Sequence, residues 1–179
     1  MNTNTKHLVY AAVFAALTAI GAFLQIPLGF TSITLQFLFT AMAGIALGPK
    51  WGAASQAVYV ILGLVGLPIF TQGGGPAYIF KPSFGFLLGL IPCAALIGAL
   101  AGEEGKPQRV VPACIAGLAV LYLVGVPYMG AILNLYMGKG LTVGQIVKSG
   151  MLIYLPGDAF KIVVAAIVAP SLCRIIKRN

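Results

Sequence analysis

The sequence predicts an all-α integral membrane protein, a single domain over residues 1–179 with six transmembrane helices and both termini in the cytoplasm. Three observations support this fold class. The 179 residues are 60% hydrophobic and only 8% charged, a composition typical of polytopic membrane proteins. The apolar runs are continuous and rich in alanine, glycine and leucine, unlike the alternating strands of a membrane β-barrel. The basic residues stand singly at the ends of these runs, so the formal charge of +8 indicates membrane orientation and no nucleic-acid partner.

The first three apolar runs are separated by helix-breaking residues. The first expected helix covers residues 8–26, which is long for the apolar core of a signal peptide, and Pro27 ends it. The second covers residues 33–47, is short for a full span, and stops at the Gly-Pro pair 48–49. The third covers residues 52–67.

The last three expected helices contain proline or follow a polar loop. Residues 83–101 form the fourth. Residues 110–137 form the fifth, which Pro127 interrupts, and residues 143–176 form the sixth. Because proline removes a helical hydrogen bond, the sixth helix is expected to break near Pro156.

The distribution of lysine and arginine sets the orientation of this bundle. An even number of spans places both termini on one side. If that side is the cytoplasm, most basic residues lie inside, as the positive-inside rule requires. The residues that then lie inside are Lys6, Lys50, Lys106, Arg109, Arg174, Lys177 and Arg178, and those outside are Lys81, Lys139 and Lys148.

One carboxylate, Asp158, lies inside an apolar run, and Lys161 follows three residues later. On a helix the two side chains leave from the same face. Pro156 and Gly157 come just before, where a helix would break and restart. An ionisable pair is expensive at membrane depth, so the pair predicts a functional site in preference to a structural ion pair.

Further polar and aromatic side chains in apolar surroundings can complete a small-ligand site, because such sites are mostly apolar with a few convergent polar groups. For Gln36 and Asn134 an interhelical hydrogen bond is an equal alternative. For Tyr122 a place in the core is favoured. The candidates are Gln36, Tyr59, Gln72, Tyr78, Tyr122, Asn134, Tyr136 and Tyr154.

Two stretches are candidates for movement or docking. Residues 71–78 are polar and glycine-rich, and they are interpreted either as a lid or as a flexible connector. Ala11, Ala15 and Ala19 form one row on the first helix, and such rows let helices approach closely. This row is either a packing surface inside the bundle or an exposed docking face for another membrane protein.

The sequence lacks the common catalytic and ATP-driven motifs. Gly73-Gly74-Gly75 is followed by Pro76 and no lysine, so it does not form a phosphate-binding loop. No His-Glu-x-x-His or Gly-x-Ser-x-Gly pattern occurs, and His7, the only histidine, has no partner at helical spacing. We therefore expect no enzymatic activity, no metal site and no cofactor.

Five motifs, spread in order along the chain, together resemble the BioY family, the biotin-specific substrate-binding (S) components of energy-coupling factor (ECF) transporters. The motifs are Ile33-Thr-Leu-Gln36, Leu47-Gly-Pro-Lys50, Gly63-Leu-Val-Gly-Leu-Pro68, Gly73-Gly-Gly-Pro with Lys81-Pro-Ser-Phe-Gly85, and Leu155-Pro-Gly-Asp-x-x-Lys161. The resemblance implies a substrate-binding domain that binds biotin tightly and imports it across the cytoplasmic membrane. Its partners would be a transmembrane coupling (T) protein and two ABC-type ATPase subunits, which alone use ATP.

The resemblance also implies roles for individual residues. Asp158 would accept from the ureido N–H groups of biotin and Lys161 would donate to a ligand oxygen, or the two roles would be reversed. Lys81 departs from the family pattern, in which glycine is more usual at that position. The predicted substrate contacts are Asp158, Lys161, Gln36, Gly73, Gly74, Gly75, Tyr78, Phe80, Tyr154 and Asn134, and the predicted contacts with the T protein are Ala11, Ala15 and Ala19.

Two alternatives to a biotin S component stay open. One is a self-sufficient carrier driven by protons through Asp158. The other is an S component for a different vitamin, because one fold serves many ligands.

Overall fold

Six α-helices and a two-stranded β-hairpin make up most of residues 3–178, the part of the chain that the computed structural model describes. The hairpin separates the first two helices. The α-helices and strands are α1 (Thr3–Phe23), β1 (Gln25–Leu28), β2 (Thr31–Thr34), α2 (Gln36–Val65), α3 (Phe84–Leu100), α4 (Pro107–Ala131), α5 (Val143–Val147) and α6 (Leu155–Arg178). A 3₁₀ helix covers Pro76–Phe80, and π-helical turns cover Ile132–Tyr136 and Lys148–Leu152.

The helices have the length and composition expected of a membrane protein. Among the described residues, three helical stretches are apolar and long enough to cross a membrane: Asn4–Phe23, Pro107–Tyr136 and Val143–Ile176. The helix Phe84–Leu100 is apolar but shorter. These stretches support the prediction of a helical membrane protein.

Helix α2 is one element with a sharp bend, where the sequence predicts two spans at 33–47 and 52–67. Gly48 leaves the helical conformation with φ 76° and ψ −178°, which glycine does without steric cost. Pro49 begins the second half, because a proline in a first helical turn forfeits no hydrogen bond. The predicted break is confirmed, but no loop separates the two halves.

The expected all-α fold is corrected at residues 25–34, where the sequence predicts a helix end, a loop and a helix start. Helix α1 stops at Phe23, and β1 then pairs antiparallel with β2 along its whole length. Gly29 adopts a φ of 70° in the turn between the strands, as tight hairpin turns favour. The side chain of Gln25 donates to the carbonyl oxygen of Thr71 at 3.0 Å, which ties the hairpin to the loop between α2 and α3.

The alanine row of α1 faces the inside of the bundle. Ala11 and Ala15 are 4% and 5% exposed, and Ala19 packs partly buried against the core. The predicted contact of Ala11, Ala15 and Ala19 with a T protein therefore does not fit their position, because the chain itself covers the row. Ala12 and Ala16, which lie beside this row, are exposed.

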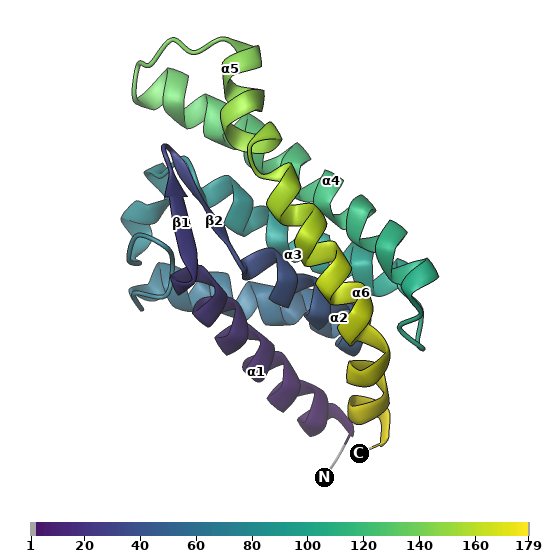
Figure 1. The fold of residues 1–179 in the computed structure, drawn as a ribbon. Coiled ribbons are helices and arrows are strands. Elements are labelled where there is room, and N and C mark those ends of the chain that lie inside the picture. The colour runs from purple at the N-terminus through teal and green to yellow at the C-terminus, as the bar shows by residue number, and fades with distance from the viewer. Residues whose placement is uncertain (1–2, 179) are drawn as a thin grey trace.

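The two described ends of the chain lie at the same end of the bundle. Figure 1 shows that α1 begins and α6 ends there, whereas α5 lies at the opposite end. Apolar contacts agree, because Ile176 near the end of α6 shares a buried cluster with Ala11 and Leu47. The hairpin extends from the end of α1 toward α5 (Figure 1), so it lies away from the two termini.

Candidate functional site

A cavity lies between the hairpin, the loop that joins α2 to α3, and helices α2, α3, α4 and α6. The cavity is open on one side, and about 660 Å³ of space lies in it and at its mouth together. Its wall combines apolar side chains with hydroxyl, amide and charged groups. The lining residues are Thr31, Ser32, Ile33, Thr34, Gln36, Phe37, Thr71, Tyr78, Ser83, Phe86, Leu87, Leu90, Leu121, Tyr122, Gly150, Tyr154, Asp158 and Lys161.

The start of α6 fixes the position of Asp158. The π-helical turn at 148–152 ends and a new α-helix begins at Leu155, which confirms the predicted break near Pro156. Pro156 and Gly157 fall in the first turn, where backbone N–H groups have no intrahelical partner in any case. Asp158 lies in the same turn, where the partial positive charge of the helix N-terminus favours a carboxylate.

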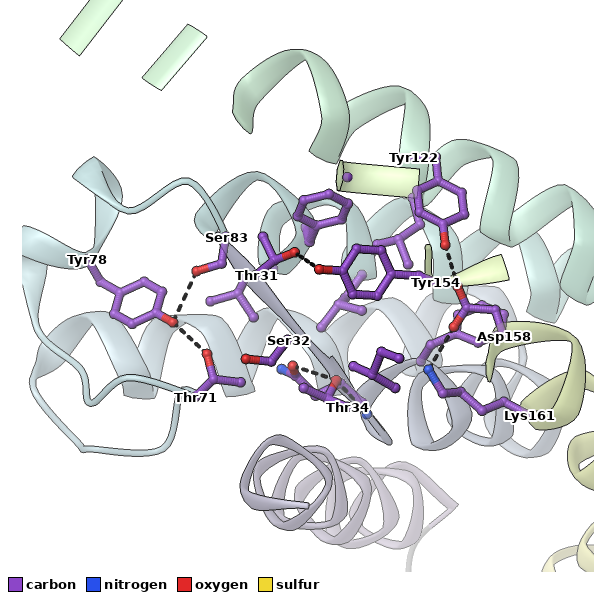
Figure 2. Close-up of a pocket in the computed structure, with 18 residues that line it drawn as sticks. Thr31, Ser32, Thr34, Thr71, Tyr78, Ser83, Tyr122, Tyr154, Asp158 and Lys161 are labelled. Atoms are coloured by element: carbon purple, nitrogen blue, oxygen red, sulfur yellow. Dashed lines mark hydrogen bonds and ion pairs between the residues drawn. The ribbon is translucent and has the colours of Figure 1, made fainter. Parts of the chain in front are cut away.

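Asp158 and Lys161 form a buried ion pair that lines the cavity. Lys161 Nζ donates to Asp158 Oδ1 at 2.7 Å, and the two residues are 5% and 6% exposed. The other carboxylate oxygen, Oδ2, accepts a short hydrogen bond from the hydroxyl of Tyr122 on α4. Figure 2 shows these three side chains together at one end of the cavity. The carboxylate is thus held by two helices, and each oxygen keeps a lone pair for a ligand.

The opposite end of the cavity is lined by hydroxyl groups, as Figure 2 shows. The Tyr78 hydroxyl shares hydrogen bonds with Thr71 at 3.0 Å and with Ser83 at 3.3 Å. Hydroxyl groups both donate and accept, so this end can receive a polar group without a cation. The nearby Lys81 is exposed and does not line the cavity.

The loop that carries Tyr78 is anchored in the core, although the sequence predicts residues 71–78 as a lid or a flexible connector. Phe70 is 1% exposed, and its ring lies edge-on to Tyr59 at 5.4 Å and tilted against Tyr78 at 4.6 Å. Gly63 makes room for this ring, because a Cβ at Gly63 would lie 2.0 Å from it. These aromatic contacts hold one wall of the cavity in place.

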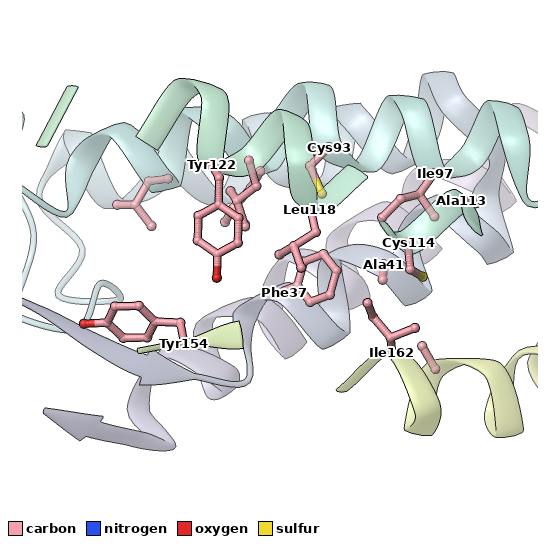
Figure 3. Packing of buried hydrophobic residues seen from close by; sticks show 14 of the residues in the cluster. Phe37, Ala41, Cys93, Ile97, Ala113, Cys114, Leu118, Tyr122, Tyr154 and Ile162 are labelled. Atoms are coloured by element: carbon pink, nitrogen blue, oxygen red, sulfur yellow. The ribbon is translucent and has the colours of Figure 1, made fainter. Parts of the chain in front are cut away.

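Apolar packing closes the floor of the cavity. Phe37 on α2 lines the cavity and belongs to the same buried cluster as Leu118 on α4. Figure 3 shows this packing continuing away from Tyr122 toward Cys93 and Ile97. The interior beneath the ion pair is therefore apolar, and charges in such surroundings interact more strongly than they do in water.

Tyr154 joins the hairpin to the start of α6. Its hydroxyl oxygen lies 2.5 Å from Thr31 Oγ1 and 3.3 Å from the carbonyl oxygen of Leu28. One hydroxyl therefore contacts both strands close to the turn. This contact ties the hairpin, which forms one wall of the cavity, to the turn just before α6.

Replacing Tyr154 by phenylalanine is expected to loosen the hairpin without unfolding the bundle. The ring stays, but the variant loses hydrogen bonds that contribute about 0.5–1.5 kcal/mol each. Amide hydrogen exchange of residues 25–34, followed by mass spectrometry, should become several times faster. Tyr136→Phe is the matched control, because Tyr136 is 63% exposed. Equal exchange rates in the native protein and Tyr154→Phe would show that the Tyr154 hydroxyl does not hold the hairpin in place.

Half of the predicted substrate contacts meet in the cavity wall. Asp158 and Lys161 come from α6, and Gln36 comes from α2. Tyr78 comes from the loop between α2 and α3, and Tyr154 comes from the turn just before α6. The predicted contacts that line the cavity are Gln36, Tyr78, Tyr154, Asp158 and Lys161.

The three predicted loop glycines lie outside the cavity lining. Gly73 and Gly75 have φ values of 102° and 99°, so the path of the loop requires glycine there. A Cβ on Gly74 would lie 2.1 Å from the carbonyl oxygen of Leu67. These glycines therefore shape the loop that carries Tyr78.

Phe80 and Asn134 also lie outside the cavity lining. Phe80 stacks on Tyr136 with ring centroids 5.0 Å apart. The Asn134 amide donates to the carbonyl oxygen of Leu141 at 2.8 Å and accepts from its N–H at 2.7 Å. Asn134 therefore closes the turn between α4 and α5.

The polar residues of the hairpin and the bond from Tyr122 to Asp158 are not among the predicted substrate contacts. The pattern Thr31-Ser-Ile-Thr34 after Gly29 was an available signal, because β-branched residues next to a glycine turn are typical of a strand. The sequence favours a place in the core for the ring of Tyr122, and the residue is only 8% exposed. Nothing in the sequence indicates that its hydroxyl reaches Asp158.

The site offers a carboxylate acceptor, an ammonium donor and several hydroxyl groups between aromatic and aliphatic walls. A carboxylate accepts N–H donors, whereas an ammonium group donates to oxygen. The combination suits a small, partly apolar molecule that carries both N–H groups and oxygen acceptors.

Comparison with known proteins gives matches over almost the whole chain. The model of the BioY family matches residues 1–178. The chain is 38% identical to the probable biotin transporter BioY of Lysinibacillus sphaericus, over 97% of this chain and 90% of that protein. It is 34% identical to the biotin transporter BioY of Thermotoga maritima, over 92% of this chain and 94% of that protein. These relatives are named as transporters and not as enzymes.

Two solved structures share the fold. The S-component for biotin from an ECF-type ABC transporter aligns with a TM-score of 0.70 and 30% identity, over 96% of this chain and 94% of that one. FolT bound with folic acid aligns with a TM-score of 0.61 and 21% identity, over 97% and 94% of the two chains, and this second likeness concerns the fold alone. The family match and the relatives together show that this chain belongs to the BioY family.

Proposed function

We propose that this protein binds biotin with high affinity and takes it up across the cell membrane as the S component of an ECF transporter. The observation that carries the proposal is the buried pair of Asp158 and Lys161 at the end of an open cavity. The relatives named as biotin transporters and the likeness to a biotin S-component identify the ligand class.

Biotin fits the chemistry of this cavity. Its ureido ring has two N–H donors and one carbonyl acceptor, which complement a carboxylate beside an ammonium group. Asp158 accepts from the ureido N–H groups and Lys161 donates to a ligand oxygen. The thiophane ring and the aliphatic chain pack against apolar wall residues such as Phe37 and Leu87.

The proposed topology has six spans with both termini in the cytoplasm. The bend at Gly48 divides α2 into two spans, and the two described chain ends lie at one end of the bundle. The hairpin, the loop between α2 and α3 and the cavity then open toward the outside, where the substrate is captured. In this orientation Lys50, Lys106 and Arg109 lie inside, as the positive-inside rule favours.

The proposed partners are a T protein and two ABC-type ATPase subunits, because the sequence carries no phosphate-binding loop of its own. The buried row at Ala11 and Ala15 is not available to a T protein in this conformation. The exposed face of α1 with Ala12 and Ala16 is the better docking surface, because its small side chains let another helix approach closely.

A biotin titration of the purified native protein tests the proposed ligand. We expect a dissociation constant in the nanomolar range, and folic acid or other vitamins at a hundredfold excess should not displace radiolabelled biotin. Displacement of biotin by another vitamin at equal concentration would indicate an S component for that vitamin.

Proteoliposomes separate the S component from the self-sufficient carrier. If this protein is an S component, vesicles that contain it alone should bind biotin but not accumulate it. Accumulation that follows an imposed proton gradient, without ATPase partners, would contradict the proposed role. Adding the T protein and the ATPases with ATP inside the vesicles should start uptake.

A further inference from the structure

The side-chain amide of Gln36 is held from both sides at the cavity wall. Its Nε2 donates to the hydroxyl oxygen of Tyr59 at 2.8 Å, and its Oε1 accepts from Thr34 Oγ1 at 3.0 Å. Gln36 is 7% exposed and lines the cavity, whereas Tyr59 is fully buried and lies outside the lining. The orientation of this amide decides whether the wall presents a donor or an acceptor to a ligand.

A backbone carbonyl at one end of this hydrogen-bonded chain fixes its direction, and the other end is compatible with it. At one end, the Tyr59 hydroxyl donates to the carbonyl oxygen of Ile69 at 3.0 Å, and a carbonyl oxygen can only accept. The single hydroxyl proton of Tyr59 is therefore used, so Tyr59 must accept from Gln36. At the other end, the backbone N–H of Gln36 donates to Thr34 Oγ1 at 3.3 Å, which leaves the Thr34 proton for Oε1.

A reversed amide would break this chain of bonds. Tyr59 would have to donate to Oε1 of Gln36, and the carbonyl oxygen of Ile69 would lose the one side-chain donor that it has among the described residues. Leaving a partly buried carbonyl unsatisfied costs free energy. The observed orientation therefore keeps the carbonyl oxygen of Ile69 paired, and it leaves the second Nε2 hydrogen of Gln36 without an acceptor in the described part of the chain.

We propose that Gln36 recognises the ligand by donating this free N–H to a ligand oxygen, and that Tyr59 is a positioning residue that sets the donor polarity from outside the cavity. The inference rests on the proposed function, because biotin carries both a ureido carbonyl and a carboxylate. It also links ligand recognition to the loop between α2 and α3, since the acceptor that orients Tyr59 belongs to Ile69 in that loop.

A double-mutant cycle between the two residues tests the proposal. Tyr59→Phe and Gln36→Met are each expected to weaken biotin binding roughly tenfold, about the effect of one buried hydrogen bond. The combined variant should bind no more weakly than Gln36→Met alone, because Tyr59 acts only through Gln36. Affinities are measured by titration with radiolabelled biotin, and folding is checked by thermal unfolding in detergent.

Two further variants complete the design. Thr34→Val removes the hydroxyl that donates to Gln36 Oε1. Its effect on affinity should also be non-additive with that of Gln36→Met, which keeps the test valid if Tyr59→Phe does not fold. Tyr128→Phe is the matched control, because the Tyr128 hydroxyl also donates to a carbonyl of the same loop, that of Ile79, but Tyr128 does not line the cavity. Its affinity should stay within about twofold of the native value.

The outcomes separate the inference from the proposed function. Fully additive losses for Tyr59→Phe and Gln36→Met, with a native protein that binds biotin, would overturn the inference alone. A native protein that does not bind biotin would overturn the proposed function, and the inference would fall with it.

Discussion

Asparagine in place of Asp158 is expected to weaken biotin binding by at least about 100-fold. The variant loses the charge that accepts the ligand's N–H groups, and hydrogen bonds to charged groups contribute roughly 1.5–3 kcal/mol each. It also leaves the Lys161 ammonium buried without a counter-charge, which is costly when the residue is 6% exposed. Titration of the purified variant beside the native protein measures the loss. Unchanged affinity would remove Asp158 from the binding site.

Two controls separate lost binding from lost stability. Asp158→Asn/Lys161→Met removes both charges, so it should recover part of the thermal stability of the single variant but none of its biotin affinity. Glu104→Gln breaks the exposed ion pair with Lys106, whose N–O distance is 2.5 Å and whose side chains are 66% and 69% exposed. Exposed pairs contribute little, so this variant should behave like the native protein in both assays.

Gly98→Ala is expected to destabilise the bundle more than any other single methyl group that we propose to add. A Cβ on Gly98 would lie 2.5 Å from the carbonyl carbon of Gly48, 2.6 Å from the nitrogen of Pro49 and 2.8 Å from the oxygen of Gly44. These are backbone atoms at the bend of α2, which cannot rotate away as a side chain can. Overpacking of this kind typically costs about 1–3 kcal/mol, so the thermal unfolding midpoint should fall by several degrees.

Gly144→Ala is the matched control for this prediction. Gly144 also lies in a helix, but a Cβ there has no atom within 4 Å. Because alanine has the higher helix propensity, this variant should be as stable as the native protein or slightly more stable. Equal unfolding midpoints for Gly98→Ala and Gly144→Ala would show that α2 and α3 do not pack as closely as described.

Residues whose type is unusual for their surroundings in the sequence were predictable as site residues or helix breaks. A carboxylate inside an apolar run singled out Asp158, and Lys161 three residues later supplied its partner. Proline and glycine marked the bend at Gly48 and the helix start before Asp158. In each case the chemistry of one or two residues decides the local structure without help from distant parts of the chain.

The direction of side chains and their partners across helices were not predictable in the same way. In a membrane protein both faces of a helix are apolar, so hydropathy does not separate the buried row at Ala11 and Ala15 from the exposed Ala12 and Ala16. The partner of Tyr122 was not predictable either, since its bond to Asp158 joins residues 36 positions apart. Such contacts follow from tertiary packing.

A crystal structure of the protein with bound biotin tests most directly whether the buried pair of Asp158 and Lys161 contacts the ligand. We predict biotin in the cavity between the hairpin and α6, with its polar atoms within hydrogen-bond distance of Asp158, Lys161 and Nε2 of Gln36. Biotin bound elsewhere, with the Asp158 carboxylate still contacting only Tyr122 and Lys161, would contradict the account.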